Sequence, residues 1–434
     1  MNSCPPRTKK TVTAILCADL GTSSIKAALI ASTGTVLAHT RVPFNVQVGS
    51  NRWLDAFKTA TATLLETTNT PVQRATTIVD IQAISISGNG PSFANEHFSY
   101  LWHEPLTPYI DKKLQTMAKN GHPCRSLFIP RLMHIKKTMP DIWDSACQSQ
   151  ANSSTQLFSL PEYLVYQLVG KAHTLLPEKR YAATYWSIHD LIDHGLFTTK
   201  KAVSNALPPF KTLTESAGNI TPDMAQQLHI QEIPVFCSGP DFISALLGTA
   251  TITPGILCDR AGSSEGINLC TKEPLIAKNI RNLPSVIPHV WNASCLIPDS
   301  GIRFSIHKKQ DAPHKNYREY VHYVLKNPTS SGYKLMHSIA LEIKQTLALL
   351  ENTAKKLRIP CNTIICTGGQ VKNPEWMQFK ANILNKPLHV TQCNDAELVG
   401  CAVVALTALG WYSSIAEGAR DLVKIKRTYN PTQE

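Results

Sequence analysis

The sequence lacks closely spaced cysteines, although it has 12 cysteines among its 434 residues. No two of them are separated by two residues, the spacing that zinc sites and redox motifs commonly use. Structural disulfides are also rare in chains of the cytoplasm. We therefore expect reduced, mostly buried cysteines in a cytoplasmic protein, with neither a disulfide framework nor a zinc site.

Long hydrophobic runs are missing as well. The longest, LVGCAVVALTALGWY at residues 398–412, is shorter than the ~18 apolar residues that a membrane span needs. The apolar stretch after the basic RTKK near the start has only about eight residues, and no A-x-A cleavage motif follows it. This segment is expected to be a strand rather than a signal peptide, and no membrane contact is expected.

The sequence has no concentrated run of basic residues. It contains 43 Lys and Arg against 31 Asp and Glu, a formal net charge of +12, but RTKK and KIKR are short. A nucleic-acid-binding face would require basic residues gathered together. We expect a diffusely basic surface without a nucleic-acid role. The content of 43% hydrophobic and 17% charged residues is typical of a globular chain, and its length predicts two or three domains.

What the sequence does contain is an unusual turn within AILCADLGTSSIKAALI, residues 14–30. An apolar strand ends on Asp19, the chain turns at Gly21, and a second apolar strand follows. A β-hairpin needs a turn, but it needs no carboxylate beside a row of hydroxyls. Phosphate and Mg²⁺ would need both. The alternative is an ordinary capped turn. The hydroxyl residues of the turn are Thr22, Ser23 and Ser24.

The same arrangement recurs in the second half of the chain. GILCDRAGSSEGINLC at residues 255–270 again gives a strand, an aspartate, a glycine, paired serines and a second strand. One match would mean little, because Gly-Ser turns are common. Two copies favour two domains of one ancestral fold. We place these domains at residues 11–242 and 243–434. The second predicted phosphate turn contains Gly262, Ser263 and Ser264.

Hydrophobic spacing predicts the elements around these turns. The first turn belongs to an antiparallel meander of three strands, and another buried strand is expected at residues 81–88. A strand ends in CSGP before Asp241 opens an apolar helix, and TIICTGG ends a further strand on two glycines. Together these elements predict an α/β protein. Longer helices are expected at residues 53–68, 156–170, 334–357 and 396–410.

In this order, the motifs resemble those of the FGGY carbohydrate kinases, the family that contains glycerol kinase and xylulokinase. DLGTSSIKA resembles the first phosphate motif of the family, GPDFISALLG the segment with its catalytic aspartate, and GSSEG its second phosphate motif. GGQVKNPEWMQFKANILNKPL resembles the adenosine segment, and FIPRLMHIKK at residues 128–137 the first family signature. The resemblance covers nearly the whole chain. It implies a two-domain duplicated actin-like or RNase H-like α/β fold with an interdomain cleft.

The resemblance also implies ATP and Mg²⁺ as cofactors and a role for each matching residue. Asp241 would be the general base that takes the proton from the accepting hydroxyl, and an N-cap is its alternative role. Asp19 would hold Mg²⁺ through water. For Asn373 a nucleotide contact and a helix cap are equally favoured, and for Lys26 a solvent-facing position is favoured over a phosphate contact. The implied cofactor-binding residues are Asp19, Gly21, Thr22, Ser23, Ser24, Gly262, Ser263, Ser264, Gly368, Gly369, Gln370 and Asn373.

The acceptor site departs from the family pattern. ISGNGPSF has fewer polar groups than the sugar-binding stretch of the family, and Phe242 stands where Asn or Gln is usual. The Trp-x-Asp-x-Arg motif aligns best with PLTPYIDKK through Asp111, whereas YLWHEPL competes through Trp102 and Glu104. We expect a less polar acceptor site than in xylulokinase or glycerol kinase. Its predicted residues are Asn89, Gly90, Asp111, Asp241 and Phe242.

Two other motifs depart from the pattern. Arg131 and His134 replace the usual Lys and Trp of the first signature. Glu265 replaces a glycine in the second phosphate motif, and a negative charge close to phosphates would be unfavourable.

The sequence therefore predicts a phosphotransferase that uses ATP and Mg²⁺ to phosphorylate a hydroxyl of a small sugar or polyol. The alternative is a catalytically weak or inactive regulatory protein of the same descent, which Glu265 and the altered sugar site favour. An actin-like or chaperone-like ATPase fits the adenosine segment and Asp241 less well. The expected partners are the sugar or polyol and ATP, without nucleic acid or membrane, with a homodimer as the possible assembly.

Overall fold

The computed structural model describes residues 10–44, 51–69, 77–119, 127–148, 153–175, 195–361 and 363–432. The chain divides into two compact units. Unit 1 comprises residues 1–244 and 397–418, and unit 2 comprises residues 245–396 and 419–434. The domain ranges 11–242 and 243–434 stay a prediction.

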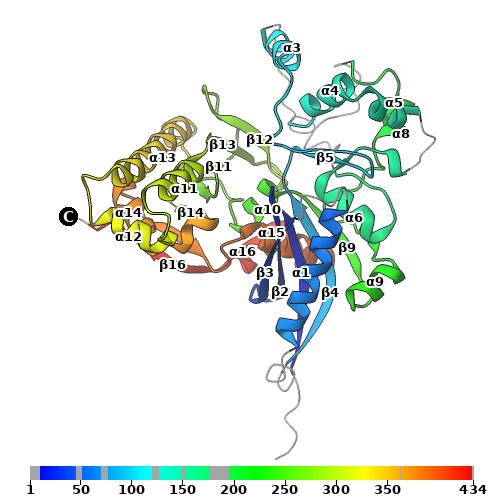
Figure 1. Cartoon of the computed structure of the whole chain (residues 1–434), viewed down its shortest axis with the longest axis horizontal. Coiled ribbons are helices and arrows are strands. Elements are labelled where there is room, and N and C mark those ends of the chain that lie inside the picture. The colour runs from blue at the N-terminus through cyan, green and yellow to red at the C-terminus, as the bar shows by residue number, and fades with distance from the viewer. Residues whose placement is uncertain are drawn as a thin grey trace, which may run out of the picture. The chain divides into compact units, whose positions relative to one another are not determined.

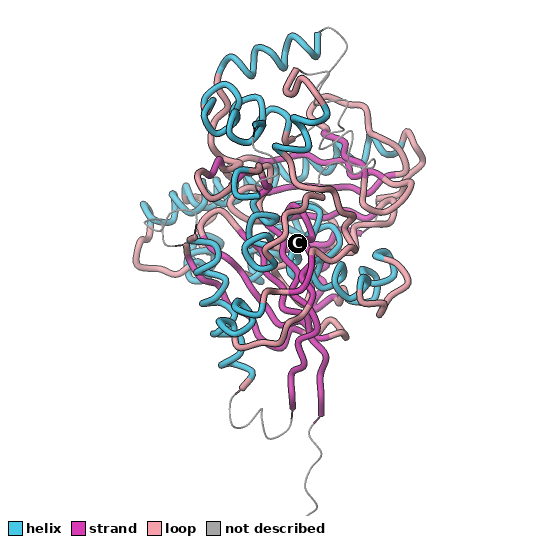
Figure 2. Tube along the Cα trace, turned by 90° about the vertical axis from the view of Figure 1, so that its right-hand side faces the viewer, coloured by secondary structure: helices cyan, strands magenta, loops and turns pink. Residues whose placement is uncertain are grey.

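Unit 1 is built around a mixed sheet in the order β3-β2-β1-β4-β9-β8 (Figure 1). β1 pairs antiparallel with β2, and β2 with β3, which confirms the predicted meander. β1 pairs parallel with β4 from Lys10 and Thr77 onward. Figure 2 shows two strands that extend downward beyond the others. The strands are β1 (Lys10–Leu20), β2 (Ser24–Ala31), β3 (Val36–Pro43), β4 (Thr77–Gly88), β8 (Gly218–Asn219) and β9 (Pro234–Pro240).

Of the two helices expected before residue 240, one is found as predicted and one begins later than expected. α1 (Arg52–Thr68) confirms the helix expected at residues 53–68 and buries Trp53 and Phe57. The helix expected from residue 156 begins only at residue 160, because residues 158–159 form a short strand. Ser159 and Glu162 then form a capping box that starts α6 (Leu160–Val169).

A smaller sheet in the order β6-β5-β7 and several short helices complete unit 1. The sheet contains β5 (Phe93–Ala94), β6 (Ser99–Tyr100) and β7 (Phe158–Ser159). The helices are α3 (Pro108–Lys119), α4 (Ile129–Thr138), α5 (Pro140–Gln148), η1 (Ser153–Thr155), α8 (Lys200–Ala206) and α9 (Pro222–Leu228). The chain passes from one unit to the other within three helices, namely α10 (Asp241–Gly248), α15 (Ala396–Ala408) and α16 (Ile415–Leu422).

Unit 2 contains a second mixed sheet, in the order β12-β13-β11-β10-β14-β15-β16. Its helices pack on a continuous hydrophobic core formed with the strands. The strands are β10 (Ile256–Ala261), β11 (Glu265–Thr271), β12 (Arg281–Pro284), β13 (Trp291–Ile297), β14 (Thr363–Thr367), β15 (Leu388–Thr391) and β16 (Ile425–Tyr429). The helices are α11 (Ser300–Asp311), α12 (Tyr317–Leu325), α13 (Ser331–Lys355), η2 (Gly369–Lys372) and α14 (Pro374–Leu384).

The two large sheets share one topology. The strands β13-β11-β10-β14-β15 repeat the order of β3-β2-β1-β4-β9. The directions also agree, because β10 is antiparallel to β11 and parallel to β14, as β1 is to β2 and β4. The predicted duplicated α/β fold is therefore confirmed, and each predicted phosphate turn joins the first two strands of its sheet.

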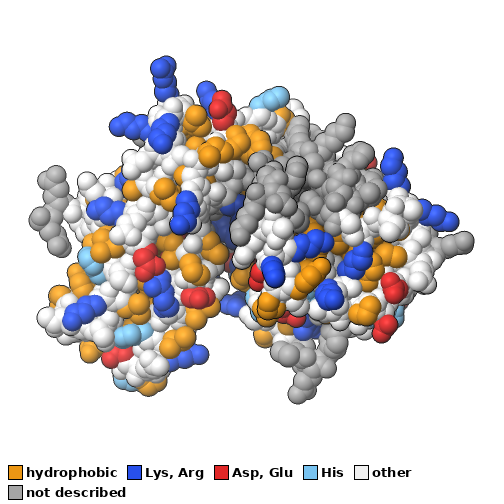
Figure 3. Space-filling model, turned by 90° about the horizontal axis from the view of Figure 1, so that it is seen from above, with side chains coloured by type: hydrophobic (Ala, Val, Ile, Leu, Met, Phe, Trp, Pro, Cys, Tyr) orange, Lys and Arg blue, Asp and Glu red, His pale blue; other side chains and the backbone are white. Residues whose placement is uncertain are grey.

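The surface features of the described residues are simple. None of the helices within the described ranges has the length and hydrophobicity that a membrane crossing requires. On the face drawn in Figure 3, Lys and Arg side chains are scattered among other residue types.

Candidate functional site

The turn between β1 and β2 is the first predicted phosphate site. The Gly21 N–H donates to the Ser24 carbonyl at 3.0 Å, which closes the turn. Thr22 and Ser23 are exposed, so their hydroxyls are accessible to a ligand. Ser24 differs from them, because its buried hydroxyl accepts a hydrogen bond from Arg41 Nε at 2.8 Å. The side chain of Ser24 thus supports the turn from within.

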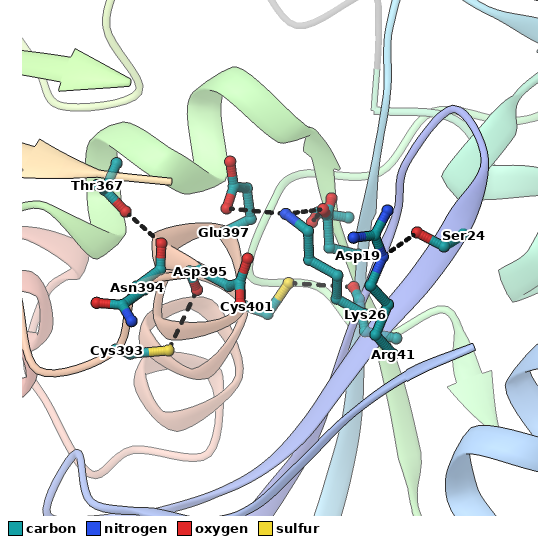
Figure 4. A network of polar contacts seen from close by, with 12 residues as sticks. Asp19, Ser24, Lys26, Arg41, Thr367, Cys393, Asn394, Asp395, Glu397 and Cys401 are labelled. Carbon is teal, nitrogen blue, oxygen red and sulfur yellow. Dashed lines mark hydrogen bonds and ion pairs between the residues drawn. The ribbon is translucent and has the colours of Figure 1, made fainter. Parts of the chain in front are cut away.

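Asp19 is buried behind this turn and forms a polar network with neighbouring residues (Figure 4). The Ser87 hydroxyl donates to its Oδ1 at 3.0 Å, and Lys26 Nζ lies 3.8 Å from its Oδ2. The same ammonium group lies 4.0 Å from Glu397 Oε2 at the start of α15. The sequence favoured a solvent-facing position for Lys26. In the structure its ammonium group instead lies near two carboxylates.

The electrostatics of Asp19 connect it to Asp241. Burial raises the pKa of Asp19 to about 7, with Lys26 opposing and Glu397 and Asp241 adding to the rise. Asp241 is the first residue of α10 and directly follows β9, in which Gly239 has a φ of +74°. The predicted metal-holding and proton-accepting carboxylates of unit 1 thus lie within electrostatic reach of each other.

The turn between β10 and β11 is the second predicted phosphate site. The Gly262 N–H donates to the Ser264 carbonyl at 2.9 Å. The Ser263 carbonyl accepts from Gly301 N–H at 3.0 Å, at the first turn of α11. Gln370 Nε2 donates to the Gly262 carbonyl at 3.1 Å. The structure therefore brings Gly262, Ser263 and Gln370 together, and Gly301 is a supporting residue that the motif comparison missed.

The strand–glycine segment after β14 lies against the same turn. Gly368 has φ +97°, and its N–H donates to the Asn394 carbonyl at 2.8 Å. A side chain at this position would overlap the Ala261 carbonyl, directly before the second phosphate turn. Asn373 N-caps α14, because its Oδ1 accepts from Glu375 N–H at 3.1 Å. The cap is therefore observed, and a nucleotide contact of Asn373 stays a prediction.

The two neighbouring glycines are expected to differ in tolerance. Gly368→Ala should lower the free energy of unfolding by about 2 kcal/mol or more, because the new Cβ overlaps backbone and the φ disfavours a side chain. Gly369→Ala is the matched control, since a Cβ there meets nothing within 4 Å. Its effect should stay within about 0.5 kcal/mol. Urea denaturation measures both, and equal effects would contradict the role assigned to Gly368.

Asp259, the aspartate of the second copy, is not equivalent to Asp19. Asp19 lies opposite Ser87 on the parallel strand, and the residue at that place in unit 2 is Arg260, opposite Thr367. Asp259 precedes Arg260, and neighbouring side chains of a strand point to opposite faces. Asp259 therefore points into the core of unit 2, whereas Asp19 belongs to the polar network of unit 1.

A buried charge cluster explains the glutamate of the second turn. Lys380 of α14 forms ion pairs with both Asp259 and Glu265, and all three side chains are at most 1% exposed. Burial and the Asp259 charge raise the pKa of Glu265 to about 8, while Lys380 opposes the rise. The Glu265 carboxylate points into the core rather than toward the exposed tip of the turn. Sequence reasoning missed Lys380, although it shares the buried helix face of Trp376, Met377, Ala381 and Leu384.

The predicted acceptor residues differ in burial, since Asn89, Gly90 and Phe242 are buried or half-buried and Asp111 is exposed. Asn89 is buried, and its Oδ1 accepts from the Ser92 hydroxyl at 2.8 Å. Its Nδ2 is buried without a hydrogen-bond partner in the described part of the chain, which leaves a donor for a ligand. Gly90 follows Asn89, and Phe242 is half-buried beside Asp241. Asp111 is exposed on α3.

Trp102 belongs to the competing alignment of the acceptor motif and contacts the first turn. Its indole Nε1 donates to Thr22 Oγ1 at 3.0 Å. Glu104 accepts from the Leu101 N–H at 2.7 Å and closes a turn of its own. The structure thus connects YLWHEPL to a predicted phosphate residue, and the substrate role of Asp111 stays a prediction.

Comparison with known proteins agrees with these features. Residues 326–409 match the FGGY family of carbohydrate kinases, C-terminal domain. The chain is 20% identical to xylulose kinase of Staphylococcus epidermidis over 97% of this chain and 93% of that protein. Among solved structures, ligand-bound xylulose kinase from Lactobacillus acidophilus has a TM-score of 0.76 at 16% identity, covering 97% of this chain and 94% of its own.

A second solved structure is similar over the same extent. Plasmodium falciparum glycerol kinase with ADP has a TM-score of 0.75 at 13% identity, covering 98% of this chain and 96% of its own. At these identities the solved structures show the fold. Together with the match at residues 326–409, they confirm the resemblance predicted from the ordered motifs.

Proposed function

We propose that this chain is a member of the FGGY family of carbohydrate kinases and a phosphotransferase with an alcohol group as acceptor. In this proposal it uses ATP and Mg²⁺ to phosphorylate a small sugar or polyol. The observation that carries the proposal is the pair of carboxylates Asp19 and Asp241, in electrostatic reach of each other beside the exposed turn of Thr22 and Ser23. Phosphoryl transfer depends mainly on positioning and charge neutralisation, which such a set of groups supplies.

Each group then has a defined role. Asp241, at the start of α10, takes the proton of the acceptor hydroxyl as the hydroxyl oxygen attacks the γ-phosphorus of ATP. The bond between this phosphorus and the β,γ-bridging oxygen breaks, and ADP leaves with the bridging oxygen. Asp19 would hold Mg²⁺ through water, and the bound ion would neutralise phosphate charge. The accessible hydroxyls of Thr22 and Ser23 donate to phosphate oxygens. These residues fit the cofactor, because hard oxygen donors and an accessible turn are what Mg²⁺ and phosphate require.

The glycines of unit 2 support the nucleotide part of the proposal. A side chain at Gly301 would overlap the Gly262 carbonyl of the second turn, and one at Gly368 would overlap the Ala261 carbonyl directly before it. Both glycines therefore let chain segments approach each other closely. Gln370 fixes the Gly262 carbonyl at 3.1 Å and leaves Ser263 exposed at the tip. We propose that Gly262, Ser263, Ser264, Gly368, Gly369 and Gln370 contact the nucleotide, with Asn373 next to them.

The acceptor site is proposed to be narrower or less polar than that of xylulokinase or glycerol kinase, and the acceptor to be a modified or shorter sugar. Phe242 and Gly90 offer no side-chain hydrogen bonds, and Asn89 Nδ2 is the buried donor available for a hydroxyl. Sites that pair every hydroxyl discriminate strongly, because an unmatched buried polar group costs about 1–3 kcal/mol. D-Xylulose and glycerol should therefore be poor substrates. A cytoplasmic location and a homodimer stay predictions.

The direct test is ADP formation by the purified chain with a panel of ketoses, polyols and shorter or modified sugars. Acceptor-dependent ADP formation with at least one compound is expected. Nucleotide binding without turnover on any acceptor would instead support a regulatory protein. Glu265 no longer favours that alternative, because its charge is paired with Lys380 in the core.

Binding of nucleotide with Mg²⁺ is expected to strengthen as the pH rises through about 7. The raised pKa of Asp19 means that its carboxyl is protonated below this value and ionised above it, and only the carboxylate attracts the ion. Titration of nucleotide affinity between about pH 5.5 and about pH 8.5 measures the midpoint. A pH-independent affinity would contradict this role.

A charge change near Asp19 should move that midpoint. Glu397→Gln removes a negative charge that raises the pKa of Asp19, so the midpoint should move to lower pH. Glu66→Gln is the control, because Glu66 is exposed on α1 and belongs to the same unit. The same shift in both variants would assign the effect to net charge and not to the Asp19 network.

A further inference from the structure

Arg131, one of the two signature replacements, holds the turn at residues 101–104. Its Nη1 donates to the carbonyls of Leu101 at 3.1 Å and Glu104 at 2.5 Å, and its Nη2 donates to the carbonyl of Trp102. The guanidinium carbon lies 4.7 Å from the centre of the Tyr100 ring. A single ammonium group cannot reproduce this planar set of donors, so arginine at this position has a geometric purpose.

His134, the other replacement, holds the segment that follows. Its ring stacks on Tyr100 with the ring centres 4.3 Å apart and the planes 8° from parallel. Its Nδ1 accepts from the Thr107 N–H at 3.3 Å, which requires a lone pair on that nitrogen. Burial and the Arg131 charge lower the pKa of His134, which favours this neutral form. The two replacements therefore act together on the segment 101–107.

The segment held in this way presents Trp102 to two predicted sites. The backbone N–H of Trp102 donates to the Ser92 hydroxyl at 3.0 Å, and that hydroxyl donates to Asn89 Oδ1 at 2.8 Å. The Trp102 indole donates to Thr22 Oγ1 at 3.0 Å. One residue thus joins a predicted acceptor residue to a predicted phosphate residue, and every contact lies within unit 1.

We propose that Trp102 is a positioning residue that makes Thr22 a hydrogen-bond donor toward phosphate, and that Arg131 holds Trp102 in place for this task. This inference rests on the proposed function. An indole N–H donates only, whereas a hydroxyl both donates and accepts. When Trp102 occupies a lone pair of Thr22 Oγ1, the Thr22 hydroxyl proton remains available to a phosphate oxygen. Binding of an acceptor beside Asn89 then influences the phosphate turn through Ser92 and Trp102.

Binding of AMP-PNP, a non-hydrolysable ATP analogue, tests the proposal without turnover. Trp102→Phe keeps an aromatic ring but removes the indole N–H, and Thr22→Val removes the hydroxyl at nearly constant volume. Each variant should weaken AMP-PNP binding by about fivefold, the effect of one hydrogen bond. The double variant should bind AMP-PNP no more weakly than either single variant, because the indole N–H acts only through the Thr22 hydroxyl. Adenosine, which has no phosphate, should bind all four proteins equally.

Arg131 is tested in the same cycle. Arg131→Lys, which restores the family's usual residue, should weaken AMP-PNP binding when Trp102 is present and have no further effect in the Trp102→Phe background. A purely structural role would lower thermal stability equally in both backgrounds and leave the affinity unchanged.

The outcomes separate this inference from the proposed function. If the wild-type chain does not bind AMP-PNP, the proposed function fails and this inference fails with it. If all variants bind AMP-PNP as the wild type does, or if the effects of Trp102→Phe and Thr22→Val add, this inference alone is overturned.

Discussion

The Asp241→Asn variant is expected to lose phosphoryl transfer while it keeps nucleotide binding. Removal of a general base lowers the rate of the chemical step by about 10²- to 10⁴-fold. Because the base acts on the acceptor hydroxyl, kcat should fall, and the ground-state affinity for the nucleotide should stay close to that of the wild type. Initial rates of ADP formation with the best acceptor, measured beside equilibrium nucleotide binding, give both quantities.

A second readout distinguishes the base from a helix cap. The Asp241 charge raises the pKa of Asp19, so Asp241→Asn should move the pH midpoint of Mg²⁺-dependent binding below about 7. Asp223→Asn is the matched control, since Asp223 is an exposed aspartate in the first turn of another helix of unit 1. An equal loss of nucleotide affinity and turnover in Asp241→Asn would identify Asp241 as a structural cap.

The Lys380→Met variant is expected to be strongly destabilised. It leaves Asp259 and Glu265 buried without their cation, and breaking a buried ion pair in this way costs about 3–5 kcal/mol. Lys386→Met is the matched control, because Lys386 is partly exposed and pairs with Glu351 at 2.8 Å. Such a surface pair contributes less than about 1 kcal/mol. Urea denaturation of the three proteins measures the difference.

The loss should also depend on pH. Burial and the Asp259 charge raise the pKa of Glu265 above its value in the unfolded chain, and Lys380→Met removes the cation that opposes this rise. The folded variant therefore binds more protons than the unfolded chain at intermediate pH. Stability then falls as the pH rises, and the deficit of Lys380→Met should be larger in alkaline than in acidic buffer. The double variant Lys380→Met/Glu265→Gln should recover part of the stability that Lys380→Met loses. A deficit no larger than that of Lys386→Met would contradict the assignment of the cluster.

Local sequence patterns predicted the fold well where the forces are local. The three-stranded meander and α1 follow from alternation and helical spacing, which a short window contains. The helix expected at residues 334–357 is α13, shifted to Ser331–Lys355 because Ser330 caps it. Helix α6 starts four residues later than expected, because the capping box at Ser159 fixes its first turn.

The second copy of the turn shows what letter-by-letter comparison misses. The repeat was recognised from its aspartate, yet Asp259 stands one strand position before the equivalent of Asp19. A shift of one residue turns a side chain to the opposite face of a sheet. Arg260 holds the equivalent position, and Asp259 became a partner of Lys380.

Contacts between segments that are distant along the chain account for the features of the structure that the sequence did not predict. Lysine is usually exposed. The sequence near Lys380 does not indicate that Asp259 and Glu265 pair with it in the core, because both partners are distant along the chain. The contact between Trp102 and Thr22 joins two segments that no local pattern relates. The signature replacements Arg131 and His134 were visible as departures from the family pattern, but their common target, the segment 101–107, needed the structure.

The most direct test is the fate of the γ-phosphate of ATP in the presence of the best acceptor from the panel. Labelled ATP and the purified chain, followed by separation of the products, show whether the label enters the acceptor or water. We expect a phosphorylated sugar or polyol in amounts equal to ADP, lost in Asp241→Asn. Label found only in inorganic phosphate, at the same rate with and without acceptor, would identify an ATPase and contradict the proposed kinase.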